Sequence, residues 1–579
     1  MALIPSESPN ILVKEFDLSG VVPAVTTSTG AFVGDFNWGP VDQPRLVGNE
    51  AELVTAFGSP DTDSAADATD FLSASMFLKY SSSAYVSRAV GDAAKNAAAA
   101  GTAPLVKNLD NWNAQSLTAN ITANKLVAKY PGTLGNSIKV SICPRSDSDA
   151  AFTNWTVDGV NMSALFDGAP ATSSYVSSLS SATAYDEAHV VVYDNDGKVS
   201  GTPGTILETF PYVSLATDAK KDDGSTNYIL DVLNNQSSYV WGASLAADFT
   251  GITNAAAFTG AGDSAVQTYA FSGGVHDALD VGDYQTGFDQ YDDPDNIQVD
   301  FLIAPGLQAD ADQRTLINYL ATIASTQRKD CVVVASPSRN LVVNTGNNSS
   351  TIASDTAKWA NTLNASSYII LDNNYVKVYD KYRDKYVFIP AAPATAGIMA
   401  AADVNSAPWF SPAGQRRGQY FGVTSLAYNP SKSQRDTLYK AAVNPIVNLP
   451  GQGILLFGDK TKLGRPSAFD RINVRRLFLV MERAIKSAAQ NVMFEFNDEF
   501  TRAEFVNIVE PFLREIKGRR GITDFRVVCD ETNNTADIID NNQFVASVFV
   551  KPARSINYVT LNFVAVRTGV DFDEVVGIV

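Results

Sequence analysis

An alternation of strand and helix patterns between residues 297 and about 445 constrains the fold more than any other feature of the chain. The segments "NIQVDFLIAPG" and "DCVVVASPS" are typical of strands, and "ADQRTLINYLATIASTQR" between them is typical of an amphipathic helix. The helix pattern "SDTAKWANTLN" and the strand pattern "SYIILD" follow. Strand, helix and strand at this spacing predict right-handed βαβ units around a parallel sheet.

The segment before residue 96 carries the same kind of pattern. A helix is expected from about Asn49 to Phe57, because Gly58 and Pro60 end the pattern there. A second helix, "ATDFLSASMFLKY", and a short strand, "AYVSRAV", come next. Residues 23–95 plus 265–450 are therefore predicted to form one α/β core.

Residues 96–264 have a different texture, rich in Ala, Ser, Thr, Asn and Gly. Short apolar alternations occur in it, and "AHVVVYDNDGKV" predicts a hairpin with its turn at residues 195–197. Low lysine and high serine content is also compatible with disorder. The regular strand patterns favour an inserted, mostly-β outer domain.

Residues 451–557 are predicted to form a C-terminal α+β domain. Residues 451–579 carry 17 basic and 17 acidic side chains, so the whole formal charge of −18 lies in the first 450 residues. One helix is expected in "DRINVRRLFLVMERAIKSAAQ", and a second from a capping box at Thr501 and Glu504 to Gly518, with a kink at Pro511. The strands "DFRVVCD" and "QFVASVFVKPA" complete this domain.

Both ends of the chain have extended patterns. In "VTLNFVAVRTGVDFDEVVGIV" (559–579), Leu561 and Phe563 alternate with Val564 and Val566, so both faces of a strand are apolar. Near the start, "NILVKEFDLSG" is a second short extended candidate, which contains Ile11 and Val13. The predicted fold class is thus multidomain α/β and α+β, with extended N- and C-terminal β-arms at residues 1–22 and 558–579.

Searches for chemistry give no site. No phosphate loop, dinucleotide fingerprint or nucleophile elbow is present, and the three cysteines lie nearly 200 residues apart. His189 and His276 have no evident catalytic partner, and the acidic segment "FDQYDDPDNIQVD" lacks calcium-loop spacing, which favours a solvated turn. No catalytic residue, cofactor or metal ligand is expected. The acidic balance argues against nucleic-acid binding, and no stretch of about 18 apolar residues predicts a membrane span.

A basic set on the two C-terminal helices has two interpretations: a face for an acidic partner, or ordinary helix-surface charge. Its members are Arg475, Arg476, Arg514, Lys517, Arg519 and Arg520.

A series of motifs in order resembles the tail sheath protein of contractile-tailed bacteriophages. The motifs are "TGAFVG", "WGP", "FSGGVHDALDVGDY", "VDFLIAPG", "RKDCVVVASPS", "ATAGIMAAAD", "WFSPAG", "AVNPIV", "GQGILLFGDKT", "FEFND" and "FRVVCDETNN". The most specific blocks are "FDRINVRRLF" and "PARSINYVTLNFVAV". The form "LFGDKT" departs from the Trp-Gly-x-Arg-Thr form common among sheaths, which affects local packing only.

The resemblance implies a structural protein that forms hexameric rings, stacked helically around a tail tube, and contracts on a baseplate signal to deliver the genome. It implies that both chain ends add strands to neighbouring subunits, so residues 8–20 and 558–576 are predicted linkage arms. Their anchors would be Ile11, Val13, Leu561, Phe563 and Val564. Its partners would be itself, the tail tube, the baseplate and the tail terminator.

On this resemblance the C-terminal domain faces the tube, and the basic set is a hypothesis for the tube contact. The protein would lie in the virion tail after assembly in the host cytoplasm. Two alternatives stay open. One is the sheath of a related contractile injector, such as a tailocin or secretion system, and the other is a cytosolic α/β enzyme.

Overall fold

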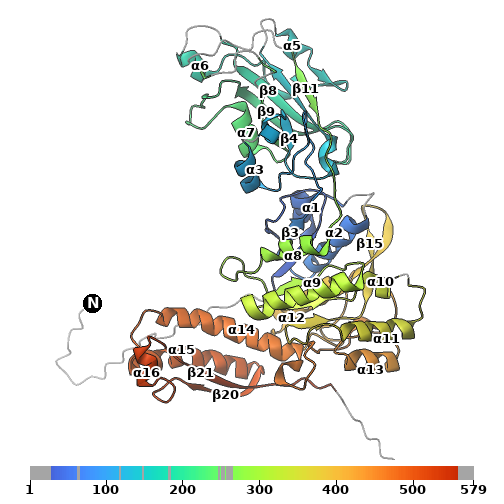
Figure 1. The fold of residues 1–579 in the computed structure, drawn as a ribbon, viewed down its shortest axis with the longest axis vertical. Coiled ribbons are helices and arrows are strands. Elements are labelled where there is room, and N and C mark those ends of the chain that lie inside the picture. Colours follow the sequence, from blue (N-terminus) through green and yellow to red (C-terminus); the bar gives the residue numbers. More distant parts are fainter. Residues whose placement is uncertain are drawn as a thin grey trace, which may run out of the picture. The chain divides into compact units, whose positions relative to one another are not determined.

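The computed structural model describes residues 28–60, 65–116, 119–145, 149–179, 184–245, 248–249, 254–255, 265–343 and 345–557 (Figure 1). Its described residues fall into two compact units. The core unit runs to Pro408 and resumes from Pro412 to Ala484, and the C-terminal unit contains Trp409–Ser411 and the residues from Ile485 onward. The five predicted domains, with their boundaries, stay a prediction.

A six-stranded sheet forms the centre of the core unit. Its order is β14 (Ile369–Leu371), β13 (Val332–Ala335), β12 (Phe301–Ile303), β1 (Gly30–Asp35), β3 (Ala84–Ala89) and β2 (Arg45–Val47). The first five strands are parallel, and β2 alone is antiparallel to its neighbour β3. The parallel sheet predicted from the strand and helix alternation is confirmed.

Helices cover both faces of this sheet because its strands are apolar on both faces. Along β13, Val333 points into one buried cluster, whereas Val332 and Val334 point into the other. The first cluster contains buried side chains from α8 (Val281–Asp289), α9 (Asp310–Thr322), α11 (Ser349–Ala360) and α13 (Lys432–Lys440). The second cluster contains buried side chains from α1 (Glu50–Phe57), α2 (Ala65–Leu78), α12 (Ala392–Asn405) and α14 (Ile472–Ala489).

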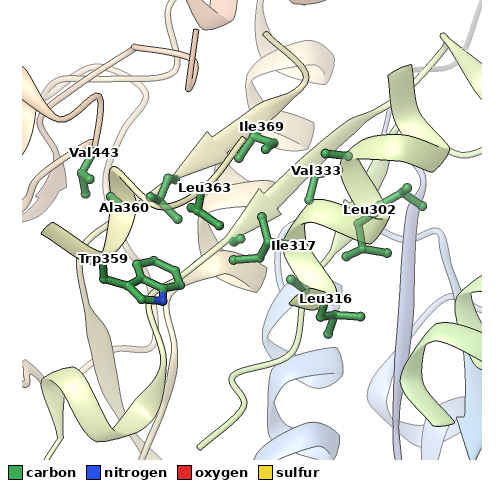
Figure 2. Packing of buried hydrophobic residues seen from close by; sticks show 14 of the residues in the cluster. Leu302, Leu316, Ile317, Val333, Trp359, Ala360, Leu363, Ile369 and Val443 are labelled. Atoms are coloured by element: carbon green, nitrogen blue, oxygen red, sulfur yellow. The ribbon is translucent and has the colours of Figure 1, made fainter. Parts of the chain in front are cut away.

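Figure 2 shows the first of these clusters from close by. Leu316 and Ile317 of α9 lie near Leu302 of β12 and Val333 of β13, and Trp359 enters from α11. Leu316, Ile317 and Val333 have no exposed surface.

The ends of α1 match the prediction. The Asn49 side chain accepts from the Glu52 backbone N–H at 2.9 Å, and the Gly58 N–H donates to the Val54 carbonyl at 2.8 Å. Gly58 takes a φ of 75°, which glycine adopts without the Cβ penalty. Asn49 therefore caps the helix that was predicted to begin there.

The helix predicted up to Arg328 is regular only in its first part. It ends as an α-helix at Thr322 and continues as a π-helix, Ile323–Arg328. Arg328 is buried at the end of that turn, and it donates to the Tyr291 carbonyl at 2.8 Å and pairs with Asp330 at 2.9 Å. The wider turn accompanies this buried arginine, which the periodicity of the sequence does not reveal.

A four-stranded antiparallel sheet lies in the inserted part of the core unit. Its order is β11 (Gln267–Ala270), β5 (Ile138–Pro144), β8 (Glu187–Asp194) and β9 (Thr205–Ser214). The predicted hairpin exists as the β8–β9 pair, but its connection runs from residue 195 to 204 and is longer than the predicted turn. The Asp194 carboxylate explains the length, because it accepts from the N–H groups of Val199 and Ser200 at 3.0 and 2.7 Å.

The remaining elements of this inserted part are short. They are α3 (Leu109–Gln115), α4 (Ala119–Thr122), β4 (Leu126–Ala128), η1 (Thr133–Ser137), α5 (Ala150–Thr153), β6 (Thr156–Val157), β7 (Val160–Asn161), η2 (Ser163–Leu165), α6 (Ser174–Leu179), α7 (Ile229–Gln236) and β10 (Val240–Gly242). Near the core sheet lie α10 (Arg339–Val342), β15 (Tyr375–Asp380), β16 (Lys385–Pro390), β17 (Ser425–Leu426), β18 (Ile446–Leu449), β19 (Gly453–Leu456) and η5 (Ala468–Asp470).

The C-terminal unit contains the end of α14, η6 (Gln490–Val492), α15 (Glu499–Gly518), β20 (Ile522–Val528), α16 (Ala536–Asp540) and β21 (Ser547–Pro552). The predicted cap at Thr501 is wrong, because Asp498 caps α15 and its carboxylate accepts the Thr501 N–H at 2.8 Å. The helix contains Pro511 and ends at Gly518, the predicted end, and the kink at Pro511 stays a prediction. None of the helices in the described ranges is long and apolar enough to cross a membrane.

Candidate functional site

The core of the C-terminal unit is a single apolar stripe on α15. Phe505, Val509, Leu513 and Ile516 recur at helical spacing and are buried. Phe505 meets the Phe544 ring edge-on at 5.5 Å between centroids. Through this stripe α15 packs against the strand β20 (Figure 1).

Strands β20 and β21 form an antiparallel ribbon that we call the C-terminal ribbon (Ile522–Val528 with Ser547–Pro552). Phe525 lies opposite Val550, and Val527 opposite Val548, and these four side chains are partly buried. Within the described residues each of the two strands pairs only with the other. Both outer edges therefore carry backbone N–H and C=O groups without a β partner in the described part of the chain.

A buried asparagine fixes the connection between the two strands. Asn534 donates to the Val545 carbonyl at 2.8 Å and accepts the Val545 N–H at 2.9 Å. Asn497, which precedes α15, donates to the Gln543 carbonyl at 2.8 Å. The connection between the two strands and the start of α15 are thus held together.

The opposite end of the ribbon is fixed by Trp409. Its indole N–H donates to the Arg519 carbonyl at 3.1 Å, and the Arg519 guanidinium lies 5.1 Å from the centre of the indole ring. Gly521 follows at this turn, and a Cβ there would lie 2.6 Å from Ile516 and 3.1 Å from Trp409. Contacts within the unit therefore hold the ribbon at both of its ends.

Four of the six predicted basic residues lie on the exposed C-terminal end of α15 and the turn after it. Arg514 pairs with Glu510 at 2.7 Å, Lys517 with Asp524 at 3.2 Å and Arg519 with Glu515 at 3.4 Å. Arg520 is exposed at a φ of 66°. Exposed ion pairs contribute little to stability, so these cations can exchange partners at low cost.

Arg475 and Arg476 are not part of this surface, and their prediction as tube-facing residues is corrected. Both lie in the core unit, where they are 7% and 5% exposed. The Arg475 guanidinium is 4.4 Å from the Tyr368 ring centre, and burial lowers its pKa. Arg476 forms an ion pair with Asp403 and lies over the Phe301 ring at 4.9 Å. The first turns of α14 are buried, so both guanidinium groups lie inside the protein and are not available to a partner.

A further buried arginine was not predicted. Arg483 donates to the Asp300 carboxylate at 2.7 Å and to the Asp330 carbonyl at 2.8 Å. Burial opposes its charge, but Asp300 and Asp330 raise the pKa of Arg483. The sequence shows Asp300 directly after "NIQV", but it does not show that Arg483 is its partner, because the two residues lie 183 positions apart.

The other chemical candidates have structural surroundings. His189 lies in β8, where its Nε2 is 2.9 Å from the Gly168 carbonyl oxygen, and burial lowers its pKa. His276 lies in a loop, 3.2 Å from Asp35. The three cysteines are buried. In the described ranges, no group of three His, Cys, Asp or Glu side chains could hold a metal ion.

The predicted anchors of the arms, Ile11, Val13, Leu561, Phe563 and Val564, lie outside the described residues. Their role stays a prediction.

Comparison with known proteins decides the family. The family model for the phage tail sheath protein central domain matches residues 280–462, and that for the phage tail sheath C-terminal domain matches residues 465–565. A tail sheath protein of Salmonella phage ViI is 33% identical over 656 residues, which cover 98% of this chain and 98% of that protein. The chain belongs to the phage tail sheath family.

Other relatives agree with this sheath assignment. The tail sheath protein of Vibrio phage KVP40 is 31% identical over 98% of this sheath chain and 99% of its own length. The crystal structure of a sheath tail protein from Listeria innocua has a TM-score of 0.53 and 12% identity, covering 92% of this chain and 96% of that one. The latter likeness supports the fold alone.

The predicted family membership is confirmed, and the sheath chain is a structural component of the virion tail. The family is structural and is not known for enzymatic activity, which leaves the enzyme alternative without support. The C-terminal ribbon lies within the matched C-terminal domain, and β12, β13 and β14 lie within the matched central domain.

Proposed function

We propose that the sheath chain polymerises as stacked hexameric rings around a tail tube and contracts to drive the tube through the host envelope. The observation that carries the proposal is the C-terminal ribbon, with two strands and two edges that have no β partner in the described residues. An edge of this kind is a template for a strand from another chain.

The sequence supplies strands for these edges. Residues 8–20 and 558–576 have extended, apolar patterns at the two ends of the chain. A segment of twenty extended residues reaches about 65 Å, which suffices to cross from one subunit to another. If each donated strand makes about five backbone hydrogen bonds at about 0.5–1.5 kcal/mol each, two arms contribute several kcal/mol per subunit.

Strand addition suits a sheath that contracts. Backbone hydrogen bonds hold the arm while side-chain contacts between the bodies of the subunits rearrange. A network joined through arms therefore stays connected as the rings change their spacing.

The tube contact is assigned to Arg514, Lys517, Arg519 and Arg520. They are exposed, and three of them form surface ion pairs that an acidic tube surface can replace. The baseplate and the tail terminator would cap the two ends of the stack, and assembly would take place in the host cytoplasm.

The arms are tested by electron microscopy of the purified full chain at rising concentration, beside a version that lacks residues 1–20 and 558–579. Long tubes from the full chain and monomers from the trimmed chain are expected. Tubes from the trimmed chain would show that the arms are not the linkers.

The tube contact is tested with Arg519→Glu combined with Arg520→Glu. This variant is expected to keep the fold and the self-association of the chain and to lose assembly on the tube. Lys385→Glu, an exposed charge of the core unit, is the matched control. Normal tube-dependent assembly of the double variant would contradict the assignment.

A further inference from the structure

The connection between α14 and α15 exposes an unusual group of large apolar side chains. In residues 493–500, which we call the aromatic loop, Met493 is 59%, Phe494 101%, Phe496 84% and Phe500 78% exposed. Single exposed apolar residues are common, but four within eight residues are typical of an interaction site.

The backbone of the aromatic loop is defined. Phe494 has a φ of 71°, a conformation that a bulky L-residue rarely adopts. The Glu495 N–H donates to the Val492 carbonyl at 3.3 Å, and the Asp498 N–H donates to the Phe496 carbonyl at 3.0 Å. The side chain of Asn497 bonds to the Gln543 carbonyl at 2.8 Å. The loop thus presents its rings from a fixed and strained backbone, which is typical of a functional segment.

The aromatic loop is also acidic. Glu495, Asp498 and Glu499 are exposed among the rings. From residue 487 to 501 the sequence contains no Lys or Arg. A surface that receives this loop must therefore offer cations beside apolar area.

The outer face of the C-terminal ribbon offers this combination. Phe549 is 60% exposed, Arg526 lies directly across from it, and Lys551 is the next residue of β21 on the same face. Neither cation has an ion-pair partner within the described ranges, whereas Asp524, opposite Lys551, is paired with Lys517 at 3.2 Å. Guanidinium and ammonium groups bind both carboxylates and the faces of aromatic rings.

We propose that the aromatic loop of one copy docks on the outer face of the C-terminal ribbon of a second copy, with Phe494 and Phe496 as apolar anchors and Glu495 and Glu499 facing Arg526 and Lys551. The exposure of Phe494 and Phe496 shows that they do not meet this face within one copy. Because the two surfaces differ, the contact is heterologous, and repetition produces a ring or a helical filament.

This inference rests on the proposed self-assembly and deepens it. A donated strand occupies an edge of the ribbon, whereas the aromatic loop occupies its face. The two contacts are therefore compatible in one assembly and separable by experiment.

The test is cysteine crosslinking between full-length chains. Phe496→Cys and Phe549→Cys are made in separate, differently tagged chains, mixed at a concentration where tubes form, and treated with a short bismaleimide. The native thiols of Cys143, Cys331 and Cys529 are buried. A crosslink between residues 496 and 549 of different chains is expected. Phe421→Cys, also an exposed aromatic position at 61%, is the matched control and is expected to give no crosslink with residue 549.

Charge reversal provides the second arm. Glu495→Arg with Glu499→Arg in the first chain, or Arg526→Glu with Lys551→Glu in the second, is expected to lower the crosslink yield at least tenfold. Combining the two reversed chains is expected to restore the yield, which a general loss of folding would not allow.

The outcomes separate this inference from the proposed function. Tubes that form without the crosslink overturn the inference and leave the arms as linkers. A crosslink from residue 496 to added tube protein, in place of a second copy, also overturns it and assigns the loop to the tube. Full chains that form no assembly under any condition contradict the proposed function and this inference together.

Discussion

The outer edge of β14 in the core unit differs from the edges of the C-terminal ribbon in whether the same chain supplies partners for its backbone groups. At β14, the Lys462 N–H donates to the Ile369 carbonyl at 2.9 Å and the Asn444 N–H to the Leu371 carbonyl at 2.8 Å. The chain itself thus covers this edge. Each edge of the C-terminal ribbon, by contrast, has no β partner in the described residues. In the core unit the same chain covers the outer edge of β14, whereas we propose that strands from other subunits complete the edges of the C-terminal ribbon.

The same contrast holds for ion pairs, and matched substitutions test it with the largest expected effect. Arg483 meets Asp300 and Arg514 meets Glu510 at the same distance, 2.7 Å, but their arginines are 14% and 69% exposed. Arg483→Met is expected to lower the free energy of unfolding by about 3–5 kcal/mol, because Asp300 then stays buried without its cation. Arg514→Met is expected to lower it by about 0–1 kcal/mol.

Urea unfolding followed by circular dichroism measures both variants. Equal losses of unfolding free energy in the Arg483→Met and Arg514→Met variants would contradict the distinction between buried ion pairs in the core unit and exposed ones in the C-terminal unit. Replacing Asp300 by Asn in the Arg483→Met background is expected to recover part of the loss.

Packing in the core is the next test. Ile317→Ala removes methyl groups from the fully buried cluster of Figure 2 and is expected to cost about 2–5 kcal/mol. Thr322→Ala, on the exposed side of the same helix, is the control and should change stability by less than about 0.5 kcal/mol. Thermal unfolding distinguishes the two; a similar loss from both would argue against a tightly packed sheet face.

A buried carboxyl in the core unit sharpens the comparison through pH. Asp372 is fully buried beside Thr395, and burial raises its pKa from 3.8 to about 7. Between about pH 4 and pH 7, the folded state therefore keeps a proton on Asp372 that the unfolded state has already released. The core loses stability as the pH rises through this window, by about 2–4 kcal/mol, and is level above it.

Asp372→Asn is expected to remove this pH dependence. Unfolding midpoints at pH 4.5 and pH 8 measure it for both proteins. An unchanged slope in the variant would show that other groups dominate the titration.

The smallest effect is expected in the aromatic loop. Phe494→Gly relieves a φ of 71° and removes a side chain that contacts little of its own unit, so the free energy of unfolding should rise by about 0.5 kcal/mol. A clear loss of stability, measured by urea unfolding, would instead place Phe494 inside the fold of its own chain.

Local rules predicted local structure well. Asn49 and Gly58 bound α1 because a cap needs only neighbouring backbone groups. Strand and helix spacing predicted the parallel sheet, because βαβ units allow few other arrangements. Thr501 failed as a cap because the helix begins earlier: Asp498, three residues before it, is the cap and accepts the N–H of Thr501, which lies in the first turn.

Long-range partners could not be read from the sequence. Two adjacent arginines such as Arg475 and Arg476 are typical of a protein surface. They are buried because distant segments supply an aromatic ring beside Arg475 and the carboxylate of Asp403 beside Arg476. The basic surface of α15 was predictable because it needs no partner. The sequence "MFEFNDEF" shows the aromatic residues of the loop. Their exposure could not be predicted, because it depends on the apolar stripe of α15, and not the loop, facing the ribbon.

The pairing of β1 with β12 has a consequence for the order of folding. Gly30 lies beside Phe301, so this pair joins segments 271 residues apart, whereas β1 and β3 are only 54 residues apart. During synthesis β1 and β3 can meet early, but one side of β1 stays open until about three hundred residues have left the ribosome. All four strands of the inserted antiparallel sheet, including β11, have been synthesised before that point. High contact order of this kind slows folding, so the nascent chain holds an unfinished, apolar sheet edge from the time β1 and β3 pair until β12 is synthesised.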